Sequence, residues 1–469
     1  MPAEEISRLP PYWRSRMASA PHLSVWPPLL APHHAQLVSG LNHLEATQWL
    51  APEELRRAAL LQAQSVLRFA ARGSRHYRAT LAGIDLARPL TEDTWRKIPL
   101  LSRRDLQRSA ADITCSDIPA QHGSVAWTQT SGSTGEPVRV SSTGLTRLFH
   151  GLFALRDHAW HERDLAGRLA AIRFTHKKGV KSAAAPDGLR APSWGSAGDG
   201  LFRTGPFGLL EIDTDVPAQM RWLLDFDPDY LLTYPNNLAA LLEHTARHGE
   251  RPPRLKAVRT LGESVSPDLR RACQDTWGAP VVDMYTTEEV GYVALQCPKH
   301  EHLHVQSEGV IVEVLDDAGA PTAPGELGRI VVTALHNLST PLIRYDIGDL
   351  GEIGPPCDCG RGLPVLRRVV GRSRGLFTLP SGERRWPLVG FARFREVAPA
   401  IRQFQIVQET RDLITARFTV DAPLTADEER ALTEIIRAAL RHPFTVRFEY
   451  PAVIAREKNG KLHDVWSRV

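Results

Sequence analysis

The middle of the chain alternates short apolar runs, rich in β-branched residues, with longer segments of helical periodicity. The strand-like runs are residues 168–174, 229–233, 257–261 and 280–284, and the helical segments are residues 236–248 and 266–276. Strands that alternate with helices usually pair in parallel, because each helix carries the chain back across one face of the sheet. This pattern predicts an α/β fold with a central parallel sheet that is covered by helices.

The segments on either side of this alternation show a different sequence pattern. Residues 1–110, which include an amphipathic helical segment beginning at Pro52, are expected to form a largely helical arm. Residues 292–370 contain turn signals at Asp316 and Pro324 between apolar runs, and therefore predict a small antiparallel β subdomain. Both segments are assigned to a large N-terminal domain of residues 1–371.

A second, smaller domain is predicted for residues 372–469. Its strand-like runs are residues 404–407, 413–418 and 445–450, and its helical segment is residues 425–441. A unit of roughly 100 residues lies within the usual size range for a domain. The pattern predicts a small α+β C-terminal domain.

Composition and charge exclude several classes of protein. The net charge of +4 is the difference between 57 basic and 53 acidic residues, and no basic stripe is interleaved with aromatic residues. We therefore expect no nucleic-acid partner. No apolar run approaches 18 residues and the N-terminus lacks the pattern of a secretory signal, so we expect a soluble, cytoplasmic protein without a membrane partner.

Residues 128–137 place five hydroxyl side chains and two glycines in one loop. The candidate phosphate ligands in this loop are Thr130, Ser131, Gly132, Ser133, Thr134 and Gly135. Glycines let the backbone approach a phosphate, while hydroxyls add donors to the backbone N–H groups. The loop is not a Walker motif, because Glu136 stands where that motif has lysine. A run of this composition taken alone is more often a surface loop.

Further motifs follow this loop in a fixed order. They occupy residues 261–263, 285–291, 344–349, 371–372 and 460–461. Because its motifs follow this order, the chain resembles the adenylate-forming superfamily of acyl-CoA synthetases, luciferases and peptide-synthetase adenylation domains. The resemblance covers roughly residues 55–469.

Two motifs indicate a branch of that superfamily. Residues 341–349, Pro-Leu-Ile-Arg-Tyr-Asp-Ile-Gly-Asp, and residues 357–361, Cys-Asp-Cys-Gly-Arg, resemble the phenylacetate-CoA ligase-like proteins. The resemblance implies that a carboxylic acid attacks the α-phosphate of ATP to give an acyl-adenylate and pyrophosphate. A nucleophile, coenzyme A in the first hypothesis, then displaces AMP. It also implies that the small C-terminal domain is mobile and rotates between these two steps.

The resemblance assigns roles to individual residues. Thr130, Glu289 and Lys461 are the expected catalytic set. The loop at 128–137 would hold the β- and γ-phosphates, Glu289 would help to hold Mg²⁺, and Lys461 would bridge the substrate carboxylate and the α-phosphate. Asp349 would accept hydrogen bonds from the ribose hydroxyls. The remaining expected nucleotide-binding residues are Gly262, Glu263, Tyr285, Thr286, Thr287 and Arg372.

Two positions depart from the family pattern. Glu288 stands where many relatives have a small hydroxyl residue, which leaves open whether Glu288 or Glu289 faces the metal. The segment after Arg372 carries Arg374 and Gly375 where relatives often have paired aspartates. Taken alone, Asp349 would be read as a turn residue and Lys461 as a surface lysine.

Three of the five cysteines cluster with histidines in a second constellation. Cys297, Cys357 and Cys359 with one imidazole would make a tetrahedral structural Zn²⁺ site. We favour His300 as the fourth ligand because of its Cys-x-x-His spacing, with His302 and His304 as alternatives. The absence of any metal also stays open.

The acid and the final acceptor are less well determined. We expect an aryl or aryl-alkyl acid as substrate, with ATP and coenzyme A as co-substrates. A carrier-protein thiol, an amine or another nucleophile is an alternative acceptor. A zinc-stabilised scaffold protein with a degenerate nucleotide site is the alternative from another class of function, and the sequence is compatible with a homodimer.

Overall fold

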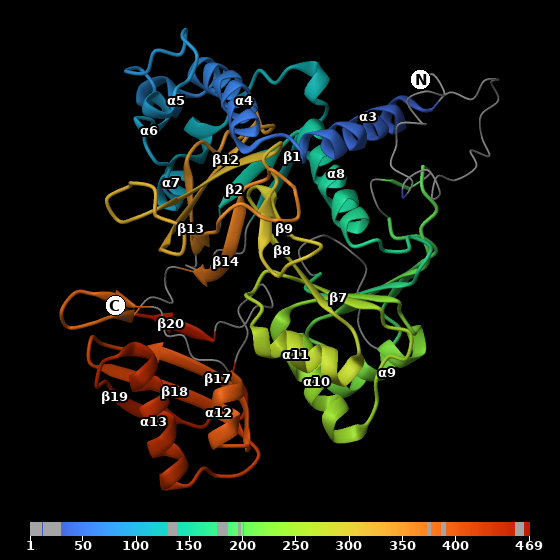
Figure 1. Cartoon of the computed structure of the whole chain (residues 1–469), viewed down its shortest axis with the longest axis vertical. Helices are drawn as coiled ribbons and strands as arrows, with labels where there is room; N and C mark the ends of the chain where they lie inside the picture. The colour runs from blue at the N-terminus through green and yellow to red at the C-terminus, as the bar shows by residue number, and fades with distance from the viewer. Residues whose placement is uncertain are drawn as a thin grey trace.

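The computed structural model describes residues 12, 30–129, 138–175, 186–195, 198–199, 201–372, 377–385, 391–454 and 464–469. Figure 1 shows a helical region at the N-terminal end, an extended sheet through the middle and a separate group of strands and helices at the C-terminal end. The described helices include none that is both long and apolar enough to cross a membrane.

A 12-stranded sheet forms the centre of the molecule, in the order β11-β12-β13-β14-β10-β9-β8-β7-β6-β3-β5-β4. Five neighbouring strands in this order, from β8 to β5, pair in parallel. These are β3 (Leu169–Arg173), β5 (Phe207–Glu211), β6 (Tyr230–Thr233), β7 (Ala257–Leu261) and β8 (Val281–Thr287). The short β4 (Leu189–Ala191) pairs antiparallel with β5 at the edge.

The other half of the sheet is antiparallel. Its strands are β9 (Gly291–Gln296), β10 (Leu303–Val305), β11 (Val310–Leu315), β12 (Leu327–Ala334), β13 (Tyr345–Ile353) and β14 (Val365–Arg372). A tight hairpin that pairs Thr287 with Gly291 joins β8 to β9 and so links the two halves edge to edge. The predicted antiparallel strands are therefore a continuation of the parallel sheet.

Helices cover the parallel strands as the alternation predicts. They are α8 (Gly144–Trp160), α9 (Val216–Phe226), α10 (Pro235–His248) and α11 (Pro267–Trp277). Asp215 and Ser266 cap the N-termini of α9 and α11, and Gly249 and Gly278 end α10 and α11 with φ of 74° and 70°, which favours glycine. Apolar side chains of α9, α10 and α11 share one buried cluster with these strands.

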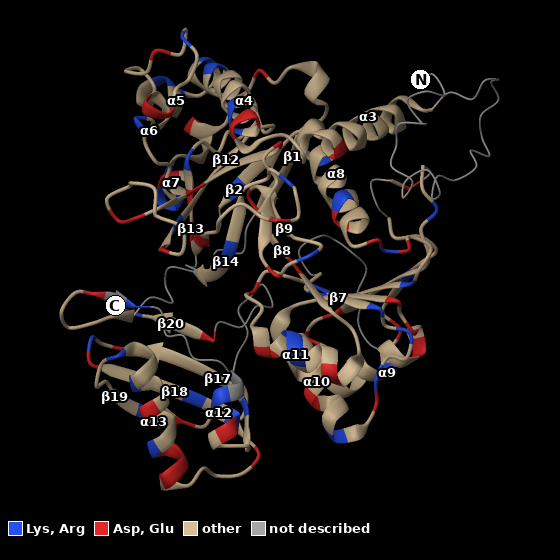
Figure 2. Cartoon of the chain, in the orientation of Figure 1, with Lys and Arg blue, Asp and Glu red and all other residues tan. Residues whose placement is uncertain are grey.

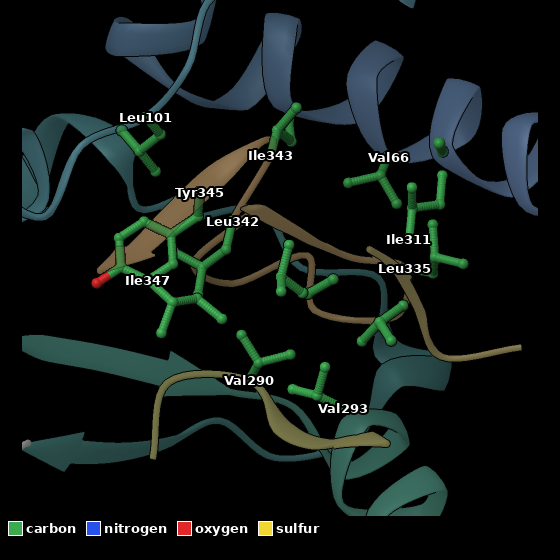
Figure 3. Close-up of a cluster of buried hydrophobic side chains, with 14 of the residues drawn as sticks. Val66, Leu101, Val290, Val293, Ile311, Leu335, Leu342, Ile343, Tyr345 and Ile347 are labelled. Atoms are coloured by element: carbon green, nitrogen blue, oxygen red, sulfur yellow. The ribbon is translucent and has the colours of Figure 1, made fainter. Parts of the chain in front are cut away.

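The N-terminal arm packs on both halves of the sheet. It comprises α3 (Pro32–Thr47), α4 (Pro52–Gly73), α5 (Arg75–Thr80), α6 (Glu92–Arg96), α7 (Arg103–Ile113) and the short 3₁₀ helix η1 (Ala120–His122). Figure 3 shows side chains of the shared core, among them Val66 of α4, Ile311 of β11, Leu342 before β13 and Tyr345 at its start. These residues are almost completely buried, so the arm and the sheet are stabilised together.

The C-terminal strands form a sheet of their own, in the order β19-β18-β17-β20. The elements are α12 (Phe391–Val397), β17 (Ile401–Gln408), β18 (Leu413–Val420), α13 (Ala426–Leu440), β19 (Thr445–Glu449) and β20 (Val465–Ser467), with a hairpin of β15 (Phe377–Thr378) and β16 (Arg384–Arg385). Thr425 and Glu428 form a capping box at the start of α13. This group, which we call the C-terminal unit, has its own buried apolar cluster.

Most predicted strands and helices agree with the observed ones to within a few residues. The elements without a predicted counterpart include α8, α9, β5 and β20. Runs as short as Phe207–Glu211 and Val465–Ser467 carry too little periodicity to predict a strand. Basic and acidic residues are interspersed over the described ribbon (Figure 2).

Candidate active site

The carboxyl ends of three neighbouring parallel strands bring several predicted residues to one edge of the sheet. Asn236 follows β6, Gly262 and Glu263 follow β7, and Glu289 follows β8. Because β6, β7 and β8 run in the same direction, their carboxyl ends meet at the same edge. Ligands of open α/β sheets bind in this position.

The segment after β7 is fixed by contacts to both of its neighbours. Gly262 has φ of 79°, a left-handed conformation that favours glycine. Glu263 Oε2 accepts a hydrogen bond from the backbone N–H of Asn236 at 3.0 Å. The hydroxyl of Ser264 donates to the carbonyl of Val370 in β14 at 3.0 Å. The segment therefore links α10 to the antiparallel half of the sheet.

The structure joins three of the expected nucleotide-binding residues. The hydroxyl of Tyr285 donates to Oδ2 of Asp349 at 2.7 Å, and both residues are buried. Asp349 lies opposite Arg372 in the pairing of β13 with β14. Positions that are far apart in the sequence thus lie beside one another at the end of the sheet.

The β8–β9 hairpin separates the two glutamates that the sequence left open. Thr286 and Thr287 are the last residues of β8, and Thr287 Oγ1 accepts a hydrogen bond from the backbone of Val290 at 3.1 Å. Glu288 is exposed, whereas Glu289 is 8% exposed and its Oε1 lies 2.8 Å from Nη1 of Arg103. The buried glutamate therefore has a cationic partner.

Arg103 is a residue that the sequence did not single out. It begins α7 directly after Ser102, the N-cap residue, which forms a capping box with Asp105. The capping box fixes the start of the helix and so directs Arg103 toward the β8–β9 hairpin. An arginine at the start of a helix carries no local signal of such a contact.

The pKa of Tyr234, in the segment after β6, is affected by the charged groups at this edge. Burial raises the pKa of Tyr234, and the carboxylates of Glu263 and Glu288 raise it further. Tyr234 is 7% exposed and immediately precedes α10. The two carboxylates are thus both close to the start of α10.

The remaining predicted catalytic and phosphate-binding residues lie outside the described residues. These are Thr130, Ser131, Gly132, Ser133, Thr134 and Gly135 of the hydroxyl-rich loop, together with Lys461. The loop follows β1 (Ala126–Gln129) and precedes β2 (Arg139–Ser142), which pair antiparallel. Their roles stay predictions from the resemblance.

The three clustered cysteines lie together with His304, one of the alternatives to the favoured His300. The Sγ atoms of Cys297 and Cys357 are 3.8 Å apart, and Nε2 of His304 lies 3.4 Å from Sγ of Cys359. All four possible ligand atoms lie within 4.8 Å of one another. His300 forms a second group of possible ligands with Cys357 and Asp358. The fourth ligand therefore stays a prediction, with His304 as the histidine that lies beside all three cysteines.

Strand pairing explains why His304 lies in the cysteine cluster. β10 lies between β9 and β14, so His304 is paired with Leu295 on one side and Val365 on the other, between the two cysteine segments. His304 is completely buried and its Nδ1 lies 3.1 Å from the carbonyl oxygen of Leu363. Burial lowers its pKa to about 4, so the imidazole is neutral. His300, in contrast, is exposed and pairs with Asp358.

The cysteine cluster also borders the N-terminal arm. The guanidinium of Arg361 lies over the rings of Trp49 and Trp160, at 4.7 and 4.6 Å from their centres. Its Nε donates to Oε1 of Gln48 at 2.8 Å, and the indole N–H of Trp160 donates to the same oxygen at 2.9 Å. The loop that carries Cys357 and Cys359 is thereby attached to the segment between α3 and α4.

Comparisons with curated proteins give partial matches, and no protein-family model matches the chain. Over 163 residues the chain is 27% identical to a phenylacetate-coenzyme A ligase of Pseudomonas putida, with 33% of this chain and 36% of that protein matched. Over 196 residues it is 26% identical to a phenylacetate-coenzyme A ligase of Thermus thermophilus, with 40% of this chain and 44% of that protein matched. The chain thus spans about two-fifths of the length of these curated relatives.

Solved structures match over much more of the chain. A 2-hydroxyisobutyryl-CoA ligase in its postadenylation state matches with a TM-score of 0.70 at 20% identity, over 90% of this chain and 91% of that one. The chain has the fold of the adenylate-forming CoA ligases. The same ligase in its thioesterification state, with 2-HIB-AMP and coenzyme A, matches over the same shares with a TM-score of 0.58. An anthranilate-CoA ligase matches 73% of this chain and 65% of that one, with a TM-score of 0.55 at 15% identity. The fold predicted from the order of the motifs is confirmed.

Proposed function

We propose that this protein is an AMP-forming ligase that activates a carboxylic acid with ATP and transfers the acyl group to coenzyme A. The observation that carries the proposal is the convergence of Glu263, Tyr285, Glu289 and Asp349 at one edge of the sheet. These residues come from separate segments, and each stands in a motif of the adenylate-forming superfamily. A structural role alone gives no reason for them to meet.

The described residues supply the binding part of the mechanism. Asp349, held by the hydroxyl of Tyr285, can accept two hydrogen bonds from the vicinal hydroxyls of a ribose. The ring of Tyr285 and the backbone after Gly262 border the same region and suit a flat base. Carboxylate oxygen is a preferred ligand of Mg²⁺, and Glu289 is a buried carboxylate at this edge. Bound Mg²⁺ would neutralise charge on the phosphates.

Lys461 and the hydroxyl-rich loop enter the proposal through the resemblance. Charge accumulates on phosphate oxygens as the acid attacks, and cations or N–H donors directed at it lower the barrier. Lys461 is assigned this role at the α-phosphate, and Thr130 with its neighbours is assigned the β- and γ-phosphates. The preferred substrate is an aryl or aryl-alkyl acid, which the phenylacetate-coenzyme A ligase relatives support.

The test is acid-dependent exchange of pyrophosphate into ATP, across aryl, phenylalkyl and short aliphatic acids. Exchange with one class, lost in Lys461→Ala and Asp349→Ala but kept in the matched surface variant Asp427→Ala, would support adenylation. A second assay then compares coenzyme A, a carrier-protein thiol and an amine as acceptors. Exchange with no acid would refute the proposed function and favour the scaffold alternative.

The cysteine cluster is proposed to hold a structural Zn²⁺ ion. Three thiols and one neutral imidazole match the ligands that tetrahedral zinc prefers, and four protein ligands leave no open position for catalysis. The residues are Cys297, His304, Cys357 and Cys359. Bound Zn²⁺ would connect β9, β10 and the loop before β14. Such close free thiols also favour a reducing compartment, which supports a cytoplasmic location.

Metal analysis of purified variants tests the zinc site. His304→Ala is expected to lose the bound metal and to lower the midpoint of thermal unfolding. His300→Ala, a matched change of an exposed histidine four residues earlier, is expected to keep the metal. Equal metal content in the two variants would contradict the assignment of His304.

The two units are proposed to be arranged as in the adenylation step. The postadenylation state of the 2-hydroxyisobutyryl-CoA ligase fits better than its thioesterification state, with TM-scores of 0.70 and 0.58 at equal coverage. Since the two states belong to one protein, the difference reports the arrangement of units. A division into domains at residue 371 is supported by the separate apolar core of the C-terminal unit.

A further inference from the structure

One face of α10 contacts the C-terminal unit along most of its length. Asn236, Glu243 and Arg247 are spaced by seven and four residues, so they lie on the same side of the helix. At the first of these positions, Nδ2 of Asn236 donates to Oδ1 of Asp464 at 3.4 Å. The backbone of Asn236 is the donor that fixes Glu263 in the candidate active site. This contact therefore joins the site edge directly to the C-terminal unit.

Further along the same face, four charged groups form a closed network between the units. Glu243 Oε1 lies 2.7 Å from Nη1 of Arg402 and 2.8 Å from Nη2 of Arg247. Arg247 Nη2 lies 3.2 Å from Oδ2 of Asp421, which also pairs with Arg402. Each cation thus contacts one carboxylate of its own unit and one of the other. Figure 2 shows charges of both signs on α10 and on the neighbouring part of the C-terminal unit.

Burial makes Glu243 and Arg402 the central pair of this network. Their side chains are 16% and 23% exposed, compared with 44% for Arg247 and 49% for Asp421. Partly buried charges are screened less by salt than exposed ones. A network also holds each side chain with more than one partner, so each added contact costs less conformational entropy than an isolated pair.

We propose that the Glu243–Arg402 pair on α10 is a docking contact that positions the C-terminal unit for adenylation. The contact must break whenever that unit takes up the thioester-forming arrangement. Glu243 and Arg402 are thus positioning residues, and their pairing sets the ratio between the two arrangements. This inference rests on the proposed function for the two half-reactions, but the docking itself is independent of any substrate.

The kinetic test measures both half-reactions in Glu243→Gln. Adenylation is followed by pyrophosphate exchange, and thioester formation is followed from chemically prepared acyl-adenylate and coenzyme A. Loss of about 1 kcal/mol of docking free energy changes the ratio of the two arrangements by about fivefold. The ratio of thioester-forming to adenylate-forming rates should rise by about this factor, whichever arrangement predominates.

A double-mutant cycle and a control make this result specific. Arg402→Gln and the Glu243→Gln/Arg402→Gln double variant should each shift the ratio of the two rates by about as much as Glu243→Gln alone, because each removes the same contact. Glu434→Gln, an exposed glutamate that pairs within the C-terminal unit, should leave the ratio unchanged. An unchanged ratio in Glu243→Gln, or an equal fall of both rates, would overturn the proposal.

A substrate-free measurement separates this inference from the proposed function. Fluorescence energy transfer between labels on the sheet and the C-terminal unit should change as NaCl rises from about 0.05 to 0.5 M, because salt screens the ion pairs. The change should be smaller in Glu243→Gln. Equal salt responses in wild type and variant would refute the docking contact, even if no acid supports pyrophosphate exchange.

Discussion

Asp157 provides the most stringent test of how buried ion pairs stabilise the strands that position the candidate site. This aspartate of α8 is completely buried, and its Oδ2 accepts hydrogen bonds from Nη1 of Arg163 and Nη2 of Arg259, both at 2.7 Å. Arg259 belongs to β7, the strand that leads directly to Gly262. The carboxylate thus connects α8 to a strand that positions the candidate nucleotide site.

The expected cost of removing this charge follows from the burial of its partners. In Asp157→Asn the guanidiniums of Arg163 and Arg259, which are 2% and 6% exposed, lose their common counter-ion. Breaking a buried ion pair in this way costs about 3–5 kcal/mol, because the uncompensated charge stays buried. For a change of 4 kcal/mol, the midpoint of urea unfolding should fall by roughly 1–2 M.

The pH dependence of stability is a second test of the contribution of the Asp157 carboxylate. Burial alone would raise the pKa of Asp157, but the charges of Arg163 and Arg259 outweigh burial and hold this pKa well below its usual range. A carboxyl with a lowered folded-state pKa stabilises the fold above its unfolded-state pKa, which is about 3.9, and loses this contribution as the pH falls further. The difference between wild type and Asp157→Asn should therefore shrink below pH 4.

The assay is urea unfolding followed by tryptophan fluorescence at pH 7 and at pH 3.5. Asp225→Asn is the matched control, since Asp225 is 70% exposed and pairs with an exposed arginine. That change should alter stability by no more than about 0.5 kcal/mol. An Asp157→Asn protein with the stability of this control would refute the reasoning.

Three further predictions concern the residues around the candidate nucleotide site. Burial raises the pKa of Asp283 to about 6, so the protonated carboxyl contributes at most about 3 kcal/mol to stability below pH 3.8, and this contribution is lost as the pH rises through 6. The stability gained by Asp283→Asn over wild type should therefore be larger at pH 8 than at pH 5. An equal difference at both pH values would contradict this prediction. Arg103→Gln should lower the Mg²⁺ concentration for half-maximal pyrophosphate exchange by about fivefold, because Arg103 competes with the metal for Glu289. A higher Mg²⁺ concentration for half-maximal exchange would instead show that Arg103 orients this carboxylate. Tyr285→Phe should raise the KM for ATP by about tenfold by removing a hydrogen bond to Asp349, and an unchanged KM would exclude this role.

The sequence predicted much of the architecture because the relevant patterns are local. Apolar runs with helical or strand periodicity placed β3, β6, β7, α10 and α11 close to their observed bounds. Three thiols near histidines likewise indicated the cysteine cluster. The sequence favoured His300 because of its spacing, whereas strand pairing brings His304 between the two cysteine segments.

The order of motifs alone thus determined the fold class and the residues expected at the nucleotide site, since each motif is read within a few neighbouring positions. Only the tertiary structure decided which distant groups meet. Arg103 contacts Glu289 across 186 residues of sequence, and Arg402 contacts Glu243 across 159. Such contacts depend on how strands pair and how helices pack, and a single charged residue carries no local sign of its eventual partner.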